Sequence, residues 1–274
     1  MAQSQPISLF YWSSVRYERK PAENYGDLLS PFIVEHLSGR EALFYDAPNR
    51  KKFWQHKKYL MAIGSIMSYT QPKAIVWGSG IISKGDNFSN ADFRAVRGPL
   101  SRKRILELGY DCPEIYGDPA LLLPTIFNPE VEKKYAYGVI PHYVDYEQAE
   151  AQYGNDEETL VINLINNDHE AVTRQILSCK QIVSSSLHGV IVAQAYGIPA
   201  VWVRFSDKLS GDNVKFDDYF QSVGVMSYLG PYIEEGSTVT EFPELFNAYS
   251  HSADPKLLAK CQQDLIDAFP FSKL

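Results

Sequence analysis

The stretch Ile182-Val183-Ser184-Ser185-Ser186-Leu187-His188-Gly189-Val190-Ile191-Val192-Ala193-Gln194-Ala195-Tyr196-Gly197-Ile198-Pro199-Ala200-Val201-Trp202 decides the fold, because it contains a complete strand–helix–strand unit. The apolar run that ends at Val183 is typical of a buried strand. The three serines offer N-cap side chains to a helix that begins near Leu187 and stops at Gly197. Pro199 prevents the helix from continuing, and the apolar residues from Ala200 onward predict the next strand.

His188 is expected in the first turn of that helix. A helix start presents free backbone N–H groups and partial positive charge, which suit a bound phosphate or carboxylate. An imidazole at this position could exchange a proton with the bound group. The alternative is purely structural: the serines cap the helix, and the histidine is satisfied by its neighbours.

Composition narrows the class of protein. The chain has 274 residues, of which 45% are hydrophobic and 22% charged, enough for one large or two small soluble domains. A formal net charge of −7 argues against a general nucleic-acid binder. Three cysteines without C-x-x-C spacing fit a reducing compartment and neither a disulfide scaffold nor a zinc site. No signal peptide or spanning segment is apparent, so we expect a cytoplasmic protein.

The first half alternates predicted strands and helices. Residues 7–12 and 74–77 are predicted strands, and 28–37 a predicted helix. Ligands of open α/β sheets lie at the carboxyl edge, where the loop before that helix carries Asn24, Gly26 and Asp27. Arg97 precedes a helix whose first residue is Pro99, so its guanidinium could bind a carboxylate or phosphate or could cap a loop. Asp118, in a Gly-Asp-Pro turn, could orient a sugar hydroxyl or cap the next turn.

The second half repeats this alternation after a polar linker. We place the boundary so that residues 1–126 form an N-terminal α/β domain and residues 127–274 a C-terminal one. His142 follows a predicted strand at 137–140. Arg204 ends the strand after the central helix, and Lys215 falls in a predicted loop that extends to residue 219. A helix is predicted from Pro255 to Ala268.

Six short motifs occur in a fixed order: Asn24-x-Gly26-Asp27, Trp77-Gly78-Ser79-Gly80, Val96-Arg97-Gly98-Pro99-x-Ser101, Gly117-Asp118-Pro119-Ala120, Ile140-Pro141-His142 and Ser184-Ser185-x-Leu187-His188-Gly189. With these motifs, over roughly residues 20 to 225, the chain resembles the polysaccharide pyruvyltransferase (ketal-pyruvate transferase) family. The resemblance implies two Rossmann-like α/β/α domains facing a cleft, similar to GT-B glycosyltransferases. It also implies transfer of a pyruvyl group from phosphoenolpyruvate to a hydroxyl pair of a glycan sugar, with no metal or other cofactor.

The resemblance assigns roles to particular residues. The Ser-Ser-x-Leu-His motif is where the family binds its donor and holds its general acid, which makes His188 the expected general acid and Ser184, Ser185, Ser186 and Leu187 donor-binding residues. Many members have Arg where this chain has Ser186. The anion clamp must then use other cations, and our candidates are Arg97, Arg204 and Lys215. Asp27, Asp118 or His142 could hold or deprotonate the acceptor hydroxyl; Asp27 is assigned as a catalytic residue, and Asn24, Asp118 and His142 as acceptor-binding residues.

Two other functions stay open at this point. A nucleotide-sugar glycosyltransferase would share the architecture, and so would a non-catalytic scaffold of a glycan-assembly complex. The partners expected are phosphoenolpyruvate and a glycan or lipid-linked acceptor, with no nucleic acid. The basic segment at residues 50–58 could contact anionic lipid at the membrane surface, and a homo-oligomer is compatible with the sequence.

Overall fold

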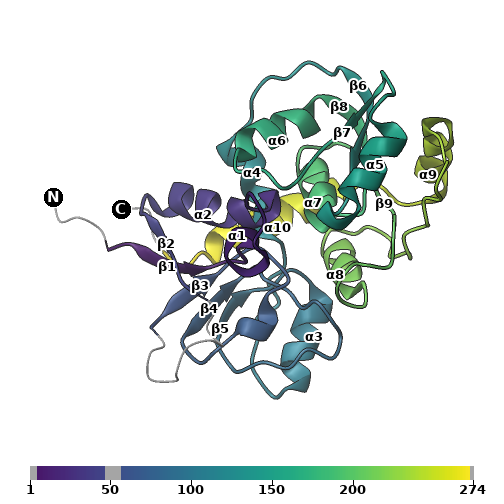
Figure 1. Cartoon of the computed structure of the whole chain (residues 1–274). Coiled ribbons are helices and arrows are strands. Elements are labelled where there is room, and N and C mark those ends of the chain that lie inside the picture. The colour runs from purple at the N-terminus through teal and green to yellow at the C-terminus, as the bar shows by residue number, and fades with distance from the viewer. Residues whose placement is uncertain (1–4, 47–56, 272–274) are drawn as a thin grey trace.

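Two parallel β-sheets flanked by helices make up the fold of the computed structural model, which describes residues 5–46 and 57–271 (Figure 1). This confirms the predicted α/β class with two Rossmann-like units. The first sheet has the order β2-β1-β3-β4-β5 and the second the order β7-β6-β8-β9, with every pairing parallel. The strands are β1 Ile7–Phe10, β2 Ala42–Phe44, β3 Tyr59–Met61, β4 Ala74–Trp77, β5 Asp92–Ala95, β6 Tyr135–Ile140, β7 Thr159–Val161, β8 Cys179–Ser184 and β9 Ala200–Trp202.

Helical segments join the strands and cover both faces of each sheet. They are α1 Ser14–Glu18, α2 Tyr25–Ser38, η3 Met67–Tyr69, α3 Pro99–Glu107, η4 Pro119–Leu122, α4 Leu123–Ile126, η5 Tyr143–Asp145, α5 Tyr146–Tyr153, α6 His169–Leu177, α7 Leu187–Ala195, α8 Val214–Ser222, η6 Val239–Glu241, α9 Phe242–Ala248 and α10 Pro255–Asp267. The predicted strand–helix–strand unit is present as β8, α7 and β9. The predicted helices before and after it are also present, as α2, α3, α6 and α10.

Alternation of side chains along the strands divides the interior into three clusters. In the first sheet, Leu9 and Leu60 face α2, whereas Phe10 and Met61 face α3. The second sheet shows the same alternation. Ile182 packs toward α6 and α7, whereas the next residue along the strand, Val183, packs toward α5 and α9. The inward faces of both sheets, with the helices between them, form one continuous hydrophobic cluster. The two halves therefore share a core.

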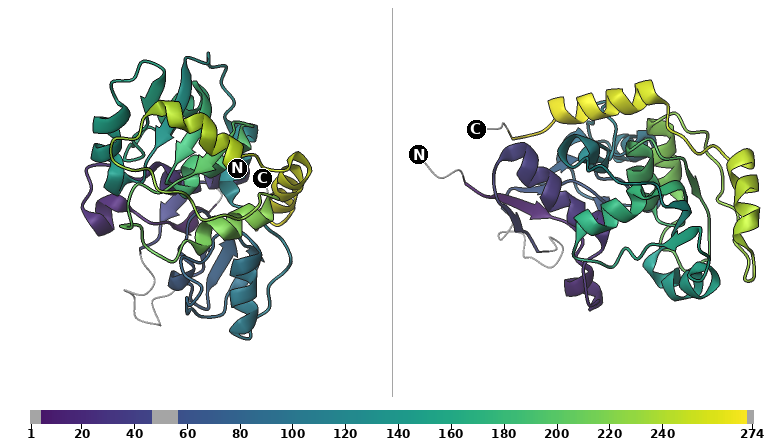
Figure 2. Two further views of the ribbon diagram at one scale, coloured as in Figure 1. Left: turned by 90° about the vertical axis from the view of Figure 1, so that its right-hand side faces the viewer. Right: turned by 90° about the horizontal axis from the view of Figure 1, so that it is seen from above.

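The C-terminal helix strengthens this junction. Helix α10 leaves the second half and runs back along the first, as the view from above shows (Figure 2). Trp77 of β4 donates a hydrogen bond from Nε1 to the carbonyl of Leu265, at 2.8 Å, and Gln262 donates to the carbonyl of Leu121, at 2.7 Å. Periodicity predicts the helix but does not indicate which half it covers. The boundary at residues 126 and 127 stays a prediction, and residues 127–134 have no regular secondary structure.

One sequence prediction about local structure is wrong. Lys215 lies in helix α8, and the predicted loop ends before it. The cluster Gly211-Asp212-Asn213 suggested a long loop, but Asp212 instead accepts a hydrogen bond from the backbone N–H of Val214 at the helix start, at 3.2 Å. The buried side chains of α8, among them Phe216 and Phe220, have the spacing of a helix.

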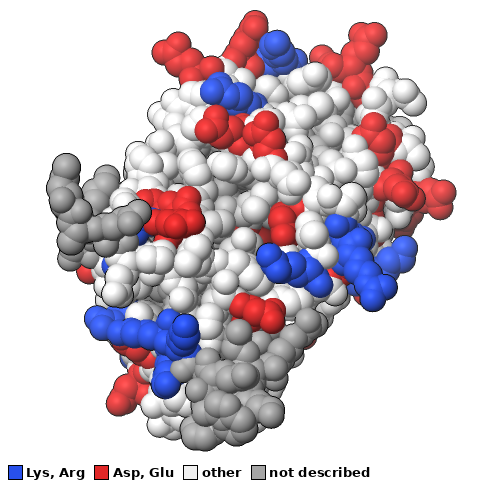
Figure 3. Space-filling view, turned by 60° about the vertical axis from the view of Figure 1, so that its left-hand side comes forward, with Lys and Arg blue, Asp and Glu red and all other residues white. Residues whose placement is uncertain are grey.

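Among the described residues, no helix has both the length and the apolar character needed to span a membrane. The basic segment at 50–58 falls largely outside the described residues, so the proposed lipid contact stays a prediction. Lysine and arginine side chains on the face drawn in Figure 3 are interspersed with acidic ones, and the described residues of that face give nucleic acid no extended stripe of positive charge.

Candidate functional site

A cavity of about 420 Å³ lies where the carboxyl ends of the two sheets meet. In each sheet the strand order reverses next to the first strand, and ligands of open α/β sheets bind at such a point. The loops after β1, β3, β6 and β8 all contribute to this cavity. The described residues that line it are Trp12, Ser14, Glu18, Asn24, Asp27, Gly64, Ser65, Ile66, Ser68, Tyr69, Ile82, His142, Tyr143, Ser186, Leu187, His188, Ser210 and Lys215.

A larger hollow of about 750 Å³ lies between α5 and residues 235–239. None of the predicted site residues lines it, and its wall contains no histidine, lysine or arginine. Among its described lining residues it therefore lacks the cationic side chains that would bind an anion, and we place the candidate site in the smaller cavity.

The turn between β8 and α7 is built by its first two serines. Ser184 Oγ donates to the carbonyl of Ile140 and accepts from the backbone N–H of Ser186, at 2.8 and 3.0 Å. Ser185 Oγ accepts from the backbone N–H of His142, at 2.8 Å. Both serines are fully buried and neither lines the cavity. Their hydrogen bonds join the β6 and β8 loops, so they shape the site without facing it.

Ser186 and Leu187 line the cavity at the beginning of α7. Ser186 is the N-cap residue, yet its side chain makes no capping hydrogen bond, contrary to the capping role expected for this serine. The first N–H groups of a helix have no partner within it. The start of this nine-residue helix therefore offers backbone donors and partial positive charge to an anion in the cavity.

His188 is the predicted residue with the most constrained position. Its side chain is 13% exposed, and Nε2 lies 3.7 Å from Asp118 Oδ2. On the other side, helix α2 approaches so closely at Gly26 that a Cβ there would lie 2.1 Å from His188 Nδ1. Nε2 is buried and has no hydrogen-bond partner among the described residues, and the side chain of His188 forms part of the cavity wall.

Asp118 lies behind His188 and not in the cavity wall. It is fully buried; Oδ1 accepts from the backbone N–H of Ala120 at 2.9 Å, and Oδ2 has no hydrogen-bond partner among the described residues. The predicted turn-capping role is thus present. A carboxylate at this place, 3.7 Å from Nε2, limits where the ring of His188 can lie, whereas contact of Asp118 with an acceptor sugar would require the wall to open.

Lys215 and His142 flank the same end of the cavity. Burial, reinforced by the charge of Arg97, lowers the pKa of Lys215 to about 8. Burial also lowers the pKa of His142 to about 3, and Lys215 and Lys20 add to this effect. The charge of Lys215 therefore changes with pH near 8, whereas His142 is neutral at ordinary pH. The ammonium group of Lys215 makes no ion pair with any described residue, which leaves it available to an anion.

The first half of the chain contributes acidic and amide groups to the same cavity wall. Asn24 caps α2 by accepting from the backbone N–H of Gly26, at 3.0 Å, and its side chain reaches the cavity. Asp27 lies one position further along α2. Burial raises the pKa of Asp27, and the nearby carboxylates of Glu18 and Glu23 raise it further. A carboxyl group with a raised pKa at the cavity wall is suited to accept a proton from a hydroxyl.

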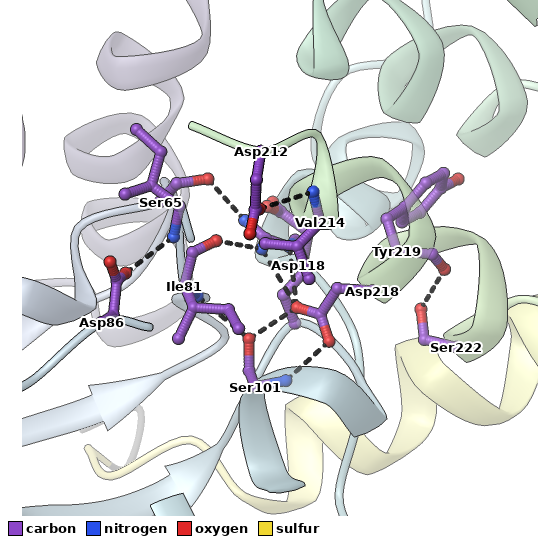
Figure 4. Close-up of polar contacts among 12 residues, drawn as sticks. Ser65, Ile81, Asp86, Ser101, Asp118, Asp212, Val214, Asp218, Tyr219 and Ser222 are labelled. Carbon is purple, nitrogen blue, oxygen red and sulfur yellow. Dashed lines mark hydrogen bonds and ion pairs between the residues drawn. The ribbon is translucent and has the colours of Figure 1, made fainter. Parts of the chain in front are cut away.

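Arg97 is placed beneath the cavity and contacts both halves. Its guanidinium pairs with Asp218 of α8, with Nη2 3.0 Å from Oδ2, and both side chains are fully buried. It also donates to Ser65 Oγ and the carbonyl of Ile81, each at 2.6 Å. Asp218 in turn accepts from the backbone N–H and the hydroxyl of Ser101 at the start of α3 (Figure 4). In this arrangement the Arg97 guanidinium is fully engaged, and it reaches the cavity only through Ser65.

Arg204 lies away from the cavity. Its Nε donates to the carbonyl of Gly230 at 2.7 Å, Nη1 is 3.7 Å from Asp207, and the guanidinium stacks over Tyr232. Of the three predicted cations, the structure therefore brings only Lys215 into the cavity wall. The donor-binding roles of Arg97 and Arg204 stay predictions.

Sequence reasoning missed several cavity residues, including Trp12, Glu18, Ser65 and Tyr143. Trp12, Ser65 and Tyr143 each lie within four residues of the end of a strand, which is the signal that could have identified them, whereas Glu18 lies eight residues beyond β1, at the end of α1. Trp12 and Glu18 follow β1, Ser65 follows β3, and Tyr143 follows β6 directly after His142.

The fold is of the two-sheet α/β kind, and its cavity is lined by a helix start, a histidine, a lysine and carboxyl groups. A sequence profile of the polysaccharide pyruvyl transferase family matches residues 24–207, and the chain belongs to this family. Two relatives extend the likeness. An uncharacterised protein of Acanthamoeba polyphaga mimivirus is 32% identical over 74% of this chain and 71% of its own length. The succinoglycan biosynthesis protein ExoV of Rhizobium meliloti is 28% identical over 79% of this chain and 65% of its own length.

Membership confirms the expected family and the coarser assignment, a transferase of polysaccharide pyruvylation. It leaves the identity of the donor and the acceptor to the proposal below.

Proposed function

We propose that the protein transfers a pyruvyl group from phosphoenolpyruvate to two hydroxyls of one sugar residue in a glycan, forming a pyruvate ketal in the biosynthesis of an exopolysaccharide, capsule or other cell-surface glycan. The observation that supports this most is the set of groups that line one cavity: the start of α7, His188 and Lys215, together with the carboxyl groups of Asp27 and Glu18.

The anionic donor fits the start of α7 and the neighbouring Lys215. Its phosphate and carboxylate can accept hydrogen bonds from the free backbone N–H groups at the start of α7. They can also form an ion pair with the ammonium group of Lys215. His188 then protonates the methylene carbon of the donor, while Asp118, 3.7 Å from Nε2, lies behind the ring. The protonated donor has a cationic centre at its central carbon.

The two hydroxyls of the acceptor sugar then react in turn with this carbon. One hydroxyl attacks the cationic carbon, and Asp27 accepts its proton. The C–O bond to phosphate breaks, phosphate leaves, and the second hydroxyl adds to the same carbon and loses its proton. The products are the cyclic ketal and inorganic phosphate, and the donor itself supplies the driving force. The proposed steps use side chains and the donor alone, without a metal or a further cofactor.

Calorimetric titration with phosphoenolpyruvate tests this proposal, with UDP-, GDP- and CMP-sugars as comparisons. We expect phosphoenolpyruvate to bind, and Lys215→Met to weaken the affinity by about tenfold, because it removes one charge-assisted contact. Arg94→Met, which changes an exposed cation outside the cavity, is the matched control and should leave the affinity unchanged. Tight binding of a nucleotide sugar, with none of phosphoenolpyruvate, would contradict the proposal in favour of glycosyl transfer.

A further inference from the structure

Glu18 has a carboxylate that is fixed by donors from both halves of the molecule. Trp12 donates from Nε1 to Oε1 at 2.6 Å, and Tyr143 donates its hydroxyl to Oε2 at 2.7 Å. All three side chains line the cavity. A carboxylate oxygen can accept more than one hydrogen bond, so each oxygen of Glu18 retains the capacity for one more.

Two more polar groups in the same wall lack partners. Ser14 is 1% exposed, and its Oγ has no hydrogen-bond partner among the described residues. In the described part of the chain, the carboxyl group of Asp27 also makes no hydrogen bond or ion pair. Buried polar groups in native proteins are nearly always satisfied, so those that face a cavity indicate a polar ligand. Trp12, packed against Tyr69 with ring centroids 5.6 Å apart, adds a flat apolar surface beside them.

We propose that Glu18 binds the hydroxyl pair of the acceptor and makes the site select an uncharged sugar ring over one that carries a carboxylate or a phosphate. This inference rests on the proposed function, because it takes the acidic wall to be the acceptor side. Two carboxylate oxygens with one free acceptor position each match two neighbouring hydroxyls. A uronic acid in the same place would bring a third carboxylate close to Glu18 and Asp27.

The charges of this wall influence one another, as the effect of Glu18 on the pKa of Asp27 indicates. Like charges about 6 Å apart in a partly hydrated cavity reduce affinity by roughly tenfold. Glu18 therefore acts in two ways, by orienting hydroxyls and by repelling anions.

The two actions can be separated with a pair of probes, methyl β-glucoside and methyl β-glucuronoside, which differ only at C6. Calorimetry or ligand-observed NMR would measure their affinities in the presence of phosphoenolpyruvate. We expect the wild-type protein to bind the glucoside at least about tenfold more tightly. Glu18→Gln keeps the shape and removes the charge, so the two affinities should come within about threefold of each other.

Two further variants serve as controls. Tyr143→Phe removes one donor and keeps the charge, so both affinities should fall while their ratio stays. Glu150 of α5 also accepts from a tyrosine hydroxyl, that of Tyr146 at 3.2 Å, but lies outside the cavity. Glu150→Gln should change neither affinity.

Three results would overturn the inference: equal wild-type affinities, an unchanged ratio in Glu18→Gln, or no binding of either probe at its solubility limit. The proposed function is judged separately. Phosphoenolpyruvate-dependent ketal formation on a uronic acid would support that function and overturn the role of Glu18. Binding of a nucleotide sugar without phosphoenolpyruvate would overturn that function, whereas a Glu18-dependent preference for the neutral probe would still support the selectivity of this wall.

Discussion

Replacing Gly26 by alanine tests whether the position of His188 controls the reaction. The added Cβ would lie 2.1 Å from Nδ1 and 2.4 Å from Cγ of the imidazole, whereas non-bonded atoms of this kind normally stay about 3.5 Å apart. Because the neighbouring atoms at this site are those of His188, its ring must withdraw by roughly 1 Å. A displacement of that size at a reacting group costs about 100-fold in rate.

The effect on folding should be much smaller. Overpacking of this kind costs about 1–3 kcal/mol, and alanine in place of glycine within a helix returns up to about 1 kcal/mol. The expected net destabilisation of about 0–2 kcal/mol is a shift in Tm of less than roughly 8 °C for a chain of this size. Gly26→Ala should therefore remain folded and lose most of its turnover.

The assay is phosphoenolpyruvate-dependent release of phosphate with a glycan acceptor, together with a thermal melt of each variant. Gly85→Ala is the matched control, since a Cβ at Gly85 would meet no atom within 4 Å. Turnover of Gly26→Ala within about threefold of the wild type would refute the reasoning, because the ring of His188 could then move without consequence.

Four further predictions follow from the same site. The affinity of the wild-type protein for phosphoenolpyruvate should fall as the pH rises through about 8, the pKa to which burial and Arg97 lower Lys215, and calorimetry should find this dependence absent in Lys215→Met. Asp218→Asn leaves the buried guanidinium of Arg97 without its carboxylate and should lower the free energy of unfolding by about 3–5 kcal/mol in a denaturant titration; a loss below about 1 kcal/mol would contradict the buried pair. His188→Gln should reduce turnover by about 100-fold or more while phosphoenolpyruvate affinity stays within about threefold, and retained turnover would exclude the general-acid role. His142→Asn should leave the shape of the pH–rate profile above pH 5 unchanged, since burial lowers the pKa of His142 to about 3, and a shifted profile would contradict that neutral state.

The sequence predicts the layout of the fold well where local signals are strong. The apolar runs of β4 and β8, the proline that begins α3 and the glycine after α7 each specify an element by local chemistry alone. Helix α8 was mistaken for a loop because its turn-forming residues Gly211-Asp212-Asn213 precede the helix and its buried aromatic face becomes evident only against the rest of the core.

The site was predictable only in part, for a physical reason. The carboxyl edge of a parallel sheet indicates which loops meet a ligand, and this places His188, Asp27 and His142 correctly at the cavity. It does not indicate which partner a charged side chain pairs with at that edge. Whether Arg97 faces the cavity or pairs with a carboxylate depends on Asp218, which lies 121 residues further along the chain. Long-range pairing of this kind has no local signature.

The shared hydrophobic cluster has a consequence for how substrates exchange. Both sheets bury their inner faces against the same helices, and α10 is hydrogen-bonded to β4. Separation of the two halves would therefore expose part of that hydrophobic cluster to water, which costs free energy. We therefore expect the two halves to stay together while substrates exchange. Under the proposed function, donor and phosphate would then exchange through the cavity without separation of the two sheets.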